Sequence, residues 1–116
     1  MWVTCHIVLP TPDSVRPGAQ VHVRVEDVTI QDVAAPVLGS VTIPAEPGAT
    51  ELGPVSLEFT PPPAGDAAIR VHVDQNGDGE VRIGDLVSVA RFHASRDAAP
   101  AAATGAIEIP VQFVTS

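Results

Sequence analysis

The sequence has few of the residues that mark a disulfide-linked or membrane-spanning protein. It has one cysteine, Cys5, so no disulfide can form within the chain. No apolar run approaches the roughly 18 residues of a membrane-spanning helix, so no transmembrane segment is expected. The first residues also lack the charged and apolar regions of a secretory leader. As written, the chain is expected in the cytoplasm, or in the periplasm or cell envelope if a leader was trimmed.

Positive charge is equally scarce. The chain has six arginines and no lysine against 14 carboxylates, which gives a net charge of −8. Such a surface repels phosphate backbones and anionic lipid headgroups, so no nucleic-acid partner is expected. The same charge balance favours cations as ligands.

Aromatic residues make up only 3% of the chain and tyrosine is absent, whereas valine is abundant and there are 12 prolines. This mixture suits short β-branched strands between proline-rich turns, and it suits long helices poorly. The length of 116 residues leaves room for one hydrophobic core, so residues 1–116 are expected to form a single domain.

Alternation of apolar and polar residues is the main pattern along the chain, and it predicts half-buried strands. Cys5 has the apolar parity of its strand, so its thiol is expected to be buried and unreactive. Turns rich in proline and glycine separate about seven such segments, which indicates an all-β fold, an antiparallel β-sandwich or a partly open barrel. The predicted strands cover residues 3–9, 21–28, 37–43, 55–59, 69–73, 86–92 and 107–113.

Two of these strands carry an irregularity. After Val25 the next apolar residues are Val28 and Ile30, so the parity changes and a β-bulge is expected near residues 26–27. Pro110 interrupts the last strand, which places that strand at a sheet edge or a bulge. The residues expected on one face of this last strand are Ile107, Ile109, Val111 and Phe113.

Residues 74–85 carry the strongest chemical signal. They resemble a twelve-residue calcium loop, with acidic or amide side chains at positions 1, 3 and 5, glycine at 6, an aliphatic residue at 8 and a carboxylate at 12. Calcium takes roughly six to eight oxygen ligands, and a tight turn brings alternate side chains to one centre. The predicted calcium ligands are Asp74, Asn76, Asp78, Glu80 (through its backbone carbonyl) and Asp85.

The other positions of the loop have expected roles as well. Gly79 permits the sharp bend, and Val81 is expected to anchor the loop in the core. Asp85 is one methylene shorter than the glutamate usual at position 12, so moderate affinity is expected. Loops with a terminal aspartate resemble those of dockerins and other extracellular calcium repeats. Here Val71 and Val73 alternate as in a strand, so the site is expected to be structural rather than a sensor.

A polar turn without a metal is the alternative interpretation of this segment. Asn76 with Gly77, and Asp78 with Gly79, are both strong hairpin dipeptides. However, three carboxylates and an amide in one turn are costly without a cation, so the sequence favours Ca²⁺. Mg²⁺ is expected to bind less well, because it prefers fewer protein ligands and more water.

Three histidines form a further candidate set. His6, His22 and His72 occupy outward positions between apolar neighbours. If their strands are adjacent, these side chains cluster and can bind a transition metal. Their spacing does not require adjacency, and solvated histidines on strands are the simpler interpretation.

The sequence also resembles a known family. Pro17, Gly18 and Ala19 lead into the alternation of residues 21–28, the strand 39–43 follows, and Gly84 precedes Asp85. Over roughly residues 3 to 94 this pattern resembles the YbaY-like lipoproteins and the YscW-type secretion pilotins, which are small β-sandwich proteins of bacterial envelopes. The resemblance implies a non-catalytic accessory or chaperone role and supplies no catalytic residues.

Three functions remain to be distinguished. No serine-histidine-aspartate order or nucleophile elbow is present, so the first expectation is a calcium-stabilised domain that is not an enzyme. The second is a pilotin-like chaperone that binds a protein or peptide partner, with the metal incidental. The third and weakest is a metal-dependent hydrolase, which needs an open coordination position and a nearby base. The oligomeric state is not predicted.

Overall fold

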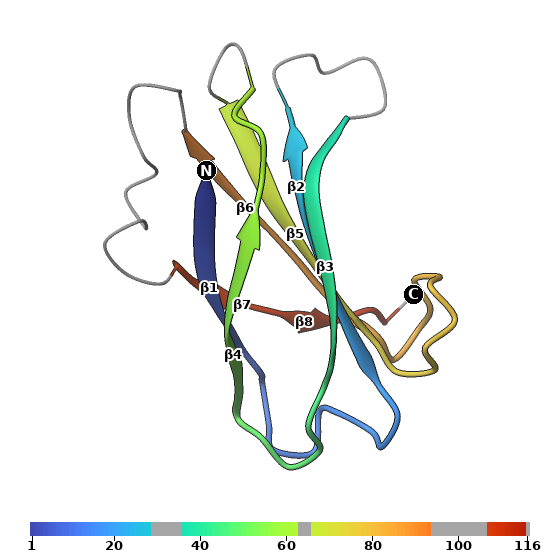
Figure 1. The fold of residues 1–116 in the computed structure, drawn as a ribbon. Helices are drawn as coiled ribbons and strands as arrows, with labels where there is room; N and C mark the ends of the chain where they lie inside the picture. Colours follow the sequence, from blue (N-terminus) through green and yellow to red (C-terminus); the bar gives the residue numbers. More distant parts are fainter. Residues whose placement is uncertain (29–35, 63–65, 94–106, 116) are drawn as a thin grey trace.

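Every regular element among the described residues is a β-strand. The computed structural model describes residues 1–28, 36–62, 66–93 and 107–115, and Figure 1 shows their arrangement. The strands are β1 (Trp2–Val8), β2 (Gln20–Asp27), β3 (Val37–Pro44), β4 (Glu51–Glu58), β5 (Asp66–Asp74), β6 (Leu86–His93), β7 (Ile107–Pro110) and β8 (Gln112–Phe113). Over the described ranges, no helix is long and apolar enough to cross a membrane.

The strands form two sheets, and this confirms the predicted all-β sandwich. A three-stranded sheet has the order β4-β1-β7, and a five-stranded sheet has the order β3-β2-β5-β6-β8. β1 is antiparallel to β4 and parallel to β7, whereas all neighbours in the larger sheet are antiparallel. The two sheets remain separate and do not close into a barrel.

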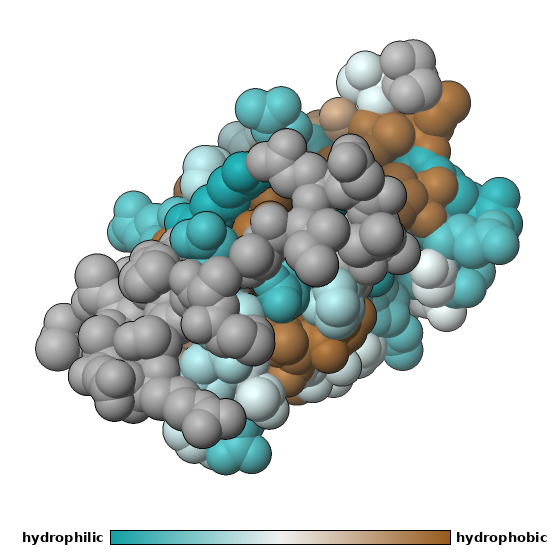
Figure 2. Space-filling view, turned by 90° about the horizontal axis from the view of Figure 1, so that it is seen from above, coloured by the Kyte–Doolittle hydropathy of each residue, from teal (hydrophilic) through white to brown (hydrophobic). Residues whose placement is uncertain are grey.

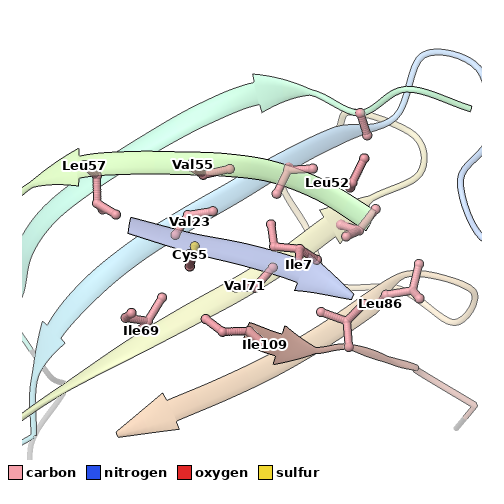
Figure 3. Close-up of a cluster of buried hydrophobic side chains, with 14 of the residues drawn as sticks. Cys5, Ile7, Val23, Leu52, Val55, Leu57, Ile69, Val71, Leu86 and Ile109 are labelled. Carbon is pink, nitrogen blue, oxygen red and sulfur yellow. The ribbon is translucent and has the colours of Figure 1, made fainter. Parts of the chain in front are cut away.

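The core lies between the two sheets and consists mainly of aliphatic side chains (Figure 3). In β1 the alternation places Val3, Cys5 and Ile7 in the core, as predicted. Full burial of one such aliphatic side chain stabilises the fold by about 1.5–3 kcal/mol. The Cys5 thiol is completely buried, and this burial raises its pKa to about 11.

A register shift is present at the predicted place, but the prediction that β2 carries the extra residue is wrong. β2 pairs with β5 without interruption, but its pairing with β3 shifts between Val25 and Glu26. Val25 lies opposite Gly39 and Glu26 lies opposite Val37, so the extra residue, Leu38, belongs to β3. Ile30, which contributed to the prediction, lies outside the described residues.

The last predicted strand is wrong in one respect, because it is two strands in different sheets. β7 pairs with β1, and β8 pairs with β6. Pro110 ends β7 at the edge of the three-stranded sheet, where its missing N–H breaks the ladder least. Val111 then crosses between the sheets, and its N–H donates to the carbonyl of Val8 (3.1 Å). As a result Phe113 is 42% exposed rather than sharing the buried face of Ile109.

The segment 75–85 is a hairpin loop. It joins β5 to β6, which pair from Val73 opposite Leu86 onwards. β2 lies on the other side of β5, so the start of β2 is next to the base of the loop. In Figure 1 the loop projects from one end of the larger sheet, close to the C-terminus. The loop is therefore flanked by strands and not by helices, as predicted.

Candidate metal site

The base of the loop is formed by two buried carboxylates. Asp74 is 0% exposed and Asp85 is 2% exposed, although both are charged residue types. The Asp74 carboxylate accepts hydrogen bonds from the N–H groups of Gly77 (3.1 Å) and Gly79 (2.6 Å). The Asp85 carboxylate accepts hydrogen bonds from the N–H groups of Gln75 (3.0 Å) and Arg82 (3.1 Å). The first and last residues of the motif therefore organise the backbone of the whole loop.

Two histidines complete this base. His22 on β2 lies opposite His72 on β5, and their ring centroids are 5.4 Å apart. His22 Nε2 lies 3.1 Å from Asp74 Oδ2, and His72 Nε2 lies 2.8 Å from Asp85 Oδ2. Donor atoms of His72, Asp74 and Asp85 lie within 4.8 Å of one another, which is close enough to hold a metal ion.

The third predicted histidine is not part of this cluster. His6 lies on β1 in the smaller sheet, where its Nδ1 is 2.6 Å from a carboxylate oxygen of Glu51. The structure therefore brings together two of the three outward histidines. Strand pairing decides this outcome, since His22 and His72 occupy paired positions of neighbouring strands.

The outer half of the loop is organised around Arg82. Its guanidinium donates to Glu80 (2.9 Å) and to Asp78, and Asp78 also accepts the N–H of Glu80 (3.0 Å). The hydrogen bond with Asp78 and the charges of both carboxylates raise the pKa of Arg82. Asn76 is exposed. Of the five predicted ligands, Asp74 and Asp85 thus meet at the base, while Asp78 and Glu80 meet at Arg82.

The bend at position 6 is as predicted, but the anchoring role of position 8 is wrong. Gly79 has a φ of +81°, a left-handed conformation that glycine adopts most easily. Val81 is 58% exposed and does not reach the core. The neighbouring Ile83 is also exposed. This loop is held by polar contacts at its base, so it does not need an apolar anchor.

Gln75 provides much of that attachment, and the sequence analysis missed it. Its side chain is buried, and its amide NH₂ donates to the carbonyls of Ser14 (2.5 Å) and Gly84 (3.2 Å). Its side-chain oxygen accepts the N–H of Arg16 (2.9 Å). No sequence signal marks this residue, because its partner segment lies about 60 residues earlier in the chain.

Both buried carboxylates are ionised at neutral pH. Burial alone would raise the pKa of Asp74, but hydrogen bonds from the Gly79 N–H and from His22 outweigh burial and lower the pKa to about 2. Burial also acts to raise the pKa of Asp85, and the contacts with His72, Gln75 and Arg82 lower it overall. Metal ligands must be deprotonated, so both aspartates are ready to coordinate a cation.

A hollow of about 610 Å³ lies next to this base, on the face of the larger sheet that points away from the core. His22 and His72 line it together with Gly79 and Val81 of the loop. Its other lining residues come from β2, β3, β5 and β6 and include Arg24, Val37, Arg70, Val87 and Val89. Towards the loop end of the molecule, at the right of Figure 2, hydrophobic and hydrophilic surfaces lie side by side.

Comparisons of the chain with family models, with curated proteins and with solved structures give no match. The chemistry of the loop and of the neighbouring sheet face is therefore the basis for assigning a function.

Proposed function

We propose that this protein is a non-catalytic β-sandwich domain whose 74–85 loop binds calcium, and that the ion stabilises the connection between β5 and β6. The observation that carries this proposal is the burial of Asp74 and Asp85 side by side at the base of the loop. These residues are positions 1 and 12 of the calcium motif, which must converge for the loop to enclose an ion.

The charge of the loop supports a cation as its ligand. Four carboxylates and one guanidinium lie within residues 74–85, so the loop has a net charge of −3 when histidines are neutral. A divalent cation offsets most of this charge. Each carboxylate offers about four lone-pair positions. Asp74 uses three of them, for Gly77, Gly79 and His22, so it can still coordinate an ion without losing its backbone contacts.

Binding requires a local rearrangement of the outer half of the loop. Asp78 and Glu80 must leave Arg82, so that Asp78 and the backbone carbonyl of Glu80 can face the ion. Side-chain exposure is 31% for Asp78, 73% for Glu80 and 53% for Arg82, so these ion pairs are weak and the exchange costs little. The shorter Asp85 side chain favours moderate affinity.

Calcium-dependent stability is the direct test. A ligand at about 100 times its dissociation constant stabilises the folded state by about 2.7 kcal/mol. For a domain of this size, the Tm should therefore rise by about 10 °C between chelator and saturating calcium. Magnesium at the same concentration should have a smaller effect. A Tm that does not respond to calcium would contradict the proposal.

Two sets of variants locate the effect. Asp74→Ala with Asp78→Ala should abolish the calcium shift, but Asp74 also supports the calcium-free fold. Asn76→Ala with Asp78→Asn leaves the buried base intact, so it should keep the Tm in chelator and lose most of the calcium shift. Asp13→Asn changes an exposed aspartate outside the loop and is the matched control. It should respond to calcium as the wild type does.

A second candidate function is the binding of a protein or peptide partner by a pilotin-like accessory domain. The hollow on the larger sheet favours it, because the lining side chains of Val37 and Val89 are about half exposed. β3 is an edge strand beside this hollow, and an extended peptide can pair with such an edge.

Affinity capture distinguishes this second candidate from the first. The wild-type protein should retain one dominant partner in the presence of a chelator. Val89→Glu should reduce that capture because it places a charge in the hollow. Trp2→Glu is the control, since Trp2 is an exposed apolar residue on the smaller sheet. Capture that depends on calcium would contradict a partner role in which the metal is incidental, and capture that is unaffected by Val89→Glu would contradict binding at the hollow.

A further inference from the structure

We propose that His22, His72, Asp74 and Asp85 form an alternative metal site at the base of the loop, selective for borderline divalent cations of the Zn²⁺ class. This site shares its two carboxylates with the proposed calcium site, but it does not depend on calcium binding. It uses two imidazole nitrogens in place of the oxygen ligands from the outer half of the loop.

Two pairs of donor atoms already lie near the spacing that a small tetrahedral ion requires. Zinc bonds to histidine nitrogen and carboxylate oxygen are about 2.0–2.2 Å long, so neighbouring ligand atoms in a tetrahedron are roughly 3.3–3.6 Å apart. The present separations are 3.1 Å between His22 and Asp74 and 2.8 Å between His72 and Asp85. Donor atoms of His72 and both aspartates lie within 4.8 Å of one another, and His22 joins them through its contact with Asp74, so side-chain shifts can bring the four donors to one ion.

The chemistry of the donors selects the class of ion. Imidazole nitrogen is a favoured ligand of Zn²⁺ and its neighbours in the first transition series, whereas Ca²⁺ and Mg²⁺ prefer oxygen. Two nitrogen and two oxygen donors therefore favour a borderline ion. The two carboxylates also offset the charge of the ion inside a largely buried site.

A second layer of contacts already orients the ligands. Thr42 Oγ1 lies 2.9 Å from His22 Nδ1 and can accept a hydrogen bond from it, which leaves Nε2 as the metal ligand. Backbone N–H groups of Gly79 and Gln75 hold the two carboxylates in place. Such supporting contacts reduce the reorganisation that metal binding requires.

The site also has a route for entry. The side chains of His22 and His72 are 31% and 14% exposed, and both line the hollow on the larger sheet. Asp74 and Asp85 lie beneath them and are almost completely buried. The imidazole side of the site therefore faces the hollow, which gives an ion access to the site. Cys5 does not compete for zinc, because it is fully buried in the core.

The test compares zinc and calcium binding to the full chain and to matched histidine variants. Calorimetry measures the affinity for each metal, and Co²⁺ replaces Zn²⁺ to report coordination through its visible absorption. The variants are His22→Gln with His72→Gln, and His6→Gln as the control, because His6 is an outward histidine on the other sheet. Circular dichroism verifies that each variant folds.

The wild type should bind one Zn²⁺, and its Co²⁺ form should show the intense visible bands of a tetrahedral ion. The double variant should lose at least about tenfold in zinc affinity, because removal of a residue that only supports a metal ligand already lowers metal affinity by about that factor. Its calcium affinity should change by less than about threefold, and His6→Gln should bind both ions as the wild type does. Calcium should also compete with zinc for the wild-type site.

Equal zinc affinity in the wild type and the double variant would overturn the inference, as would the weak absorption of six-coordinate Co²⁺. Calcium binding without specific zinc binding would overturn this inference and leave the calcium proposal standing. Zinc binding that requires the two histidines, with no calcium binding, would support this inference and contradict the calcium proposal.

Discussion

Replacement of Asp85 by asparagine tests whether the buried base holds the loop in the absence of any metal. The carboxylate of Asp85 accepts three hydrogen bonds, from the N–H groups of Gln75 and Arg82 and from His72 Nε2. Asparagine has one oxygen that can still accept the Gln75 N–H. Its amide NH₂ then faces the Arg82 N–H and His72 Nε2, whose hydrogen bonds the second carboxylate oxygen accepts in the wild type.

The expected loss follows from these contacts. A hydrogen bond to a charged group contributes about 1.5–3 kcal/mol, and a buried donor without a partner costs about 1–3 kcal/mol. The Arg82 N–H lies at the edge of the site and can reach water, so it does not carry the full cost of a buried donor without a partner. We expect Asp85→Asn to lower the free energy of unfolding by about 2–4 kcal/mol, which is a large part of the stability of a small domain.

Urea unfolding followed by circular dichroism measures this change, with a chelator present so that no metal contributes. The Tm should fall by about 10 °C. Asp13→Asn makes the same chemical change at an exposed position and should alter stability by no more than about 0.5 kcal/mol. If Asp85→Asn is as stable as Asp13→Asn, the buried carboxylate does not organise the loop.

Three further predictions concern Arg82, Asp74 and Cys5. Arg82→Gln should raise calcium affinity several-fold in calorimetry, because the guanidinium no longer competes for Asp78; unchanged or weaker binding would contradict this. Asp74 has a folded-state pKa of about 2, below the usual 3.8, so its stabilisation is present above about pH 4 and is lost as the pH falls towards 2. The difference in unfolding free energy between wild type and Asp74→Asn in chelator should shrink over that pH range. A constant difference would show that the ionised Asp74 carboxylate is not the source of this stability. The Cys5 thiol has a pKa of about 11, so it should not react with a thiol reagent at pH 8 until urea unfolds the protein; rapid reaction of the folded protein would show that the thiol is accessible.

Much of the fold was predictable because alternation reports directly on burial. The alternation of Val21, Val23 and Val25 marks which face of β2 packs in the core, whatever strand lies beside it. The register shift near Glu26 was predicted as well, but the extra residue was assigned to β2 and lies in β3, because only the pairing of the two strands decides which of them carries it. The split between β7 and β8 was not predictable, since Val111 is buried in either arrangement and only the pairing partner differs.

The loop also has some features that were predictable from the sequence and others that were not. Its ends and its bend were predictable, because the spacing of Asp74, Gly79 and Asp85 is a local property of the chain. The exposure of Val81 and the burial of Gln75 were not, because both depend on contacts with distant segments. The position of Arg82 between Asp78 and Glu80 likewise depends on the folded shape of the loop.

The sequence by itself therefore determined the all-β class, the extent of most strands, and a polar, acidic hairpin loop at residues 74–85. Only the tertiary structure decided that His22 and His72 are neighbours, that they meet Asp74 and Asp85, and that His6 lies on the other sheet. The physical reason is the range of the interactions. Alternation and turn residues act over a few positions, whereas strand pairing joins residues that are about 50 positions apart.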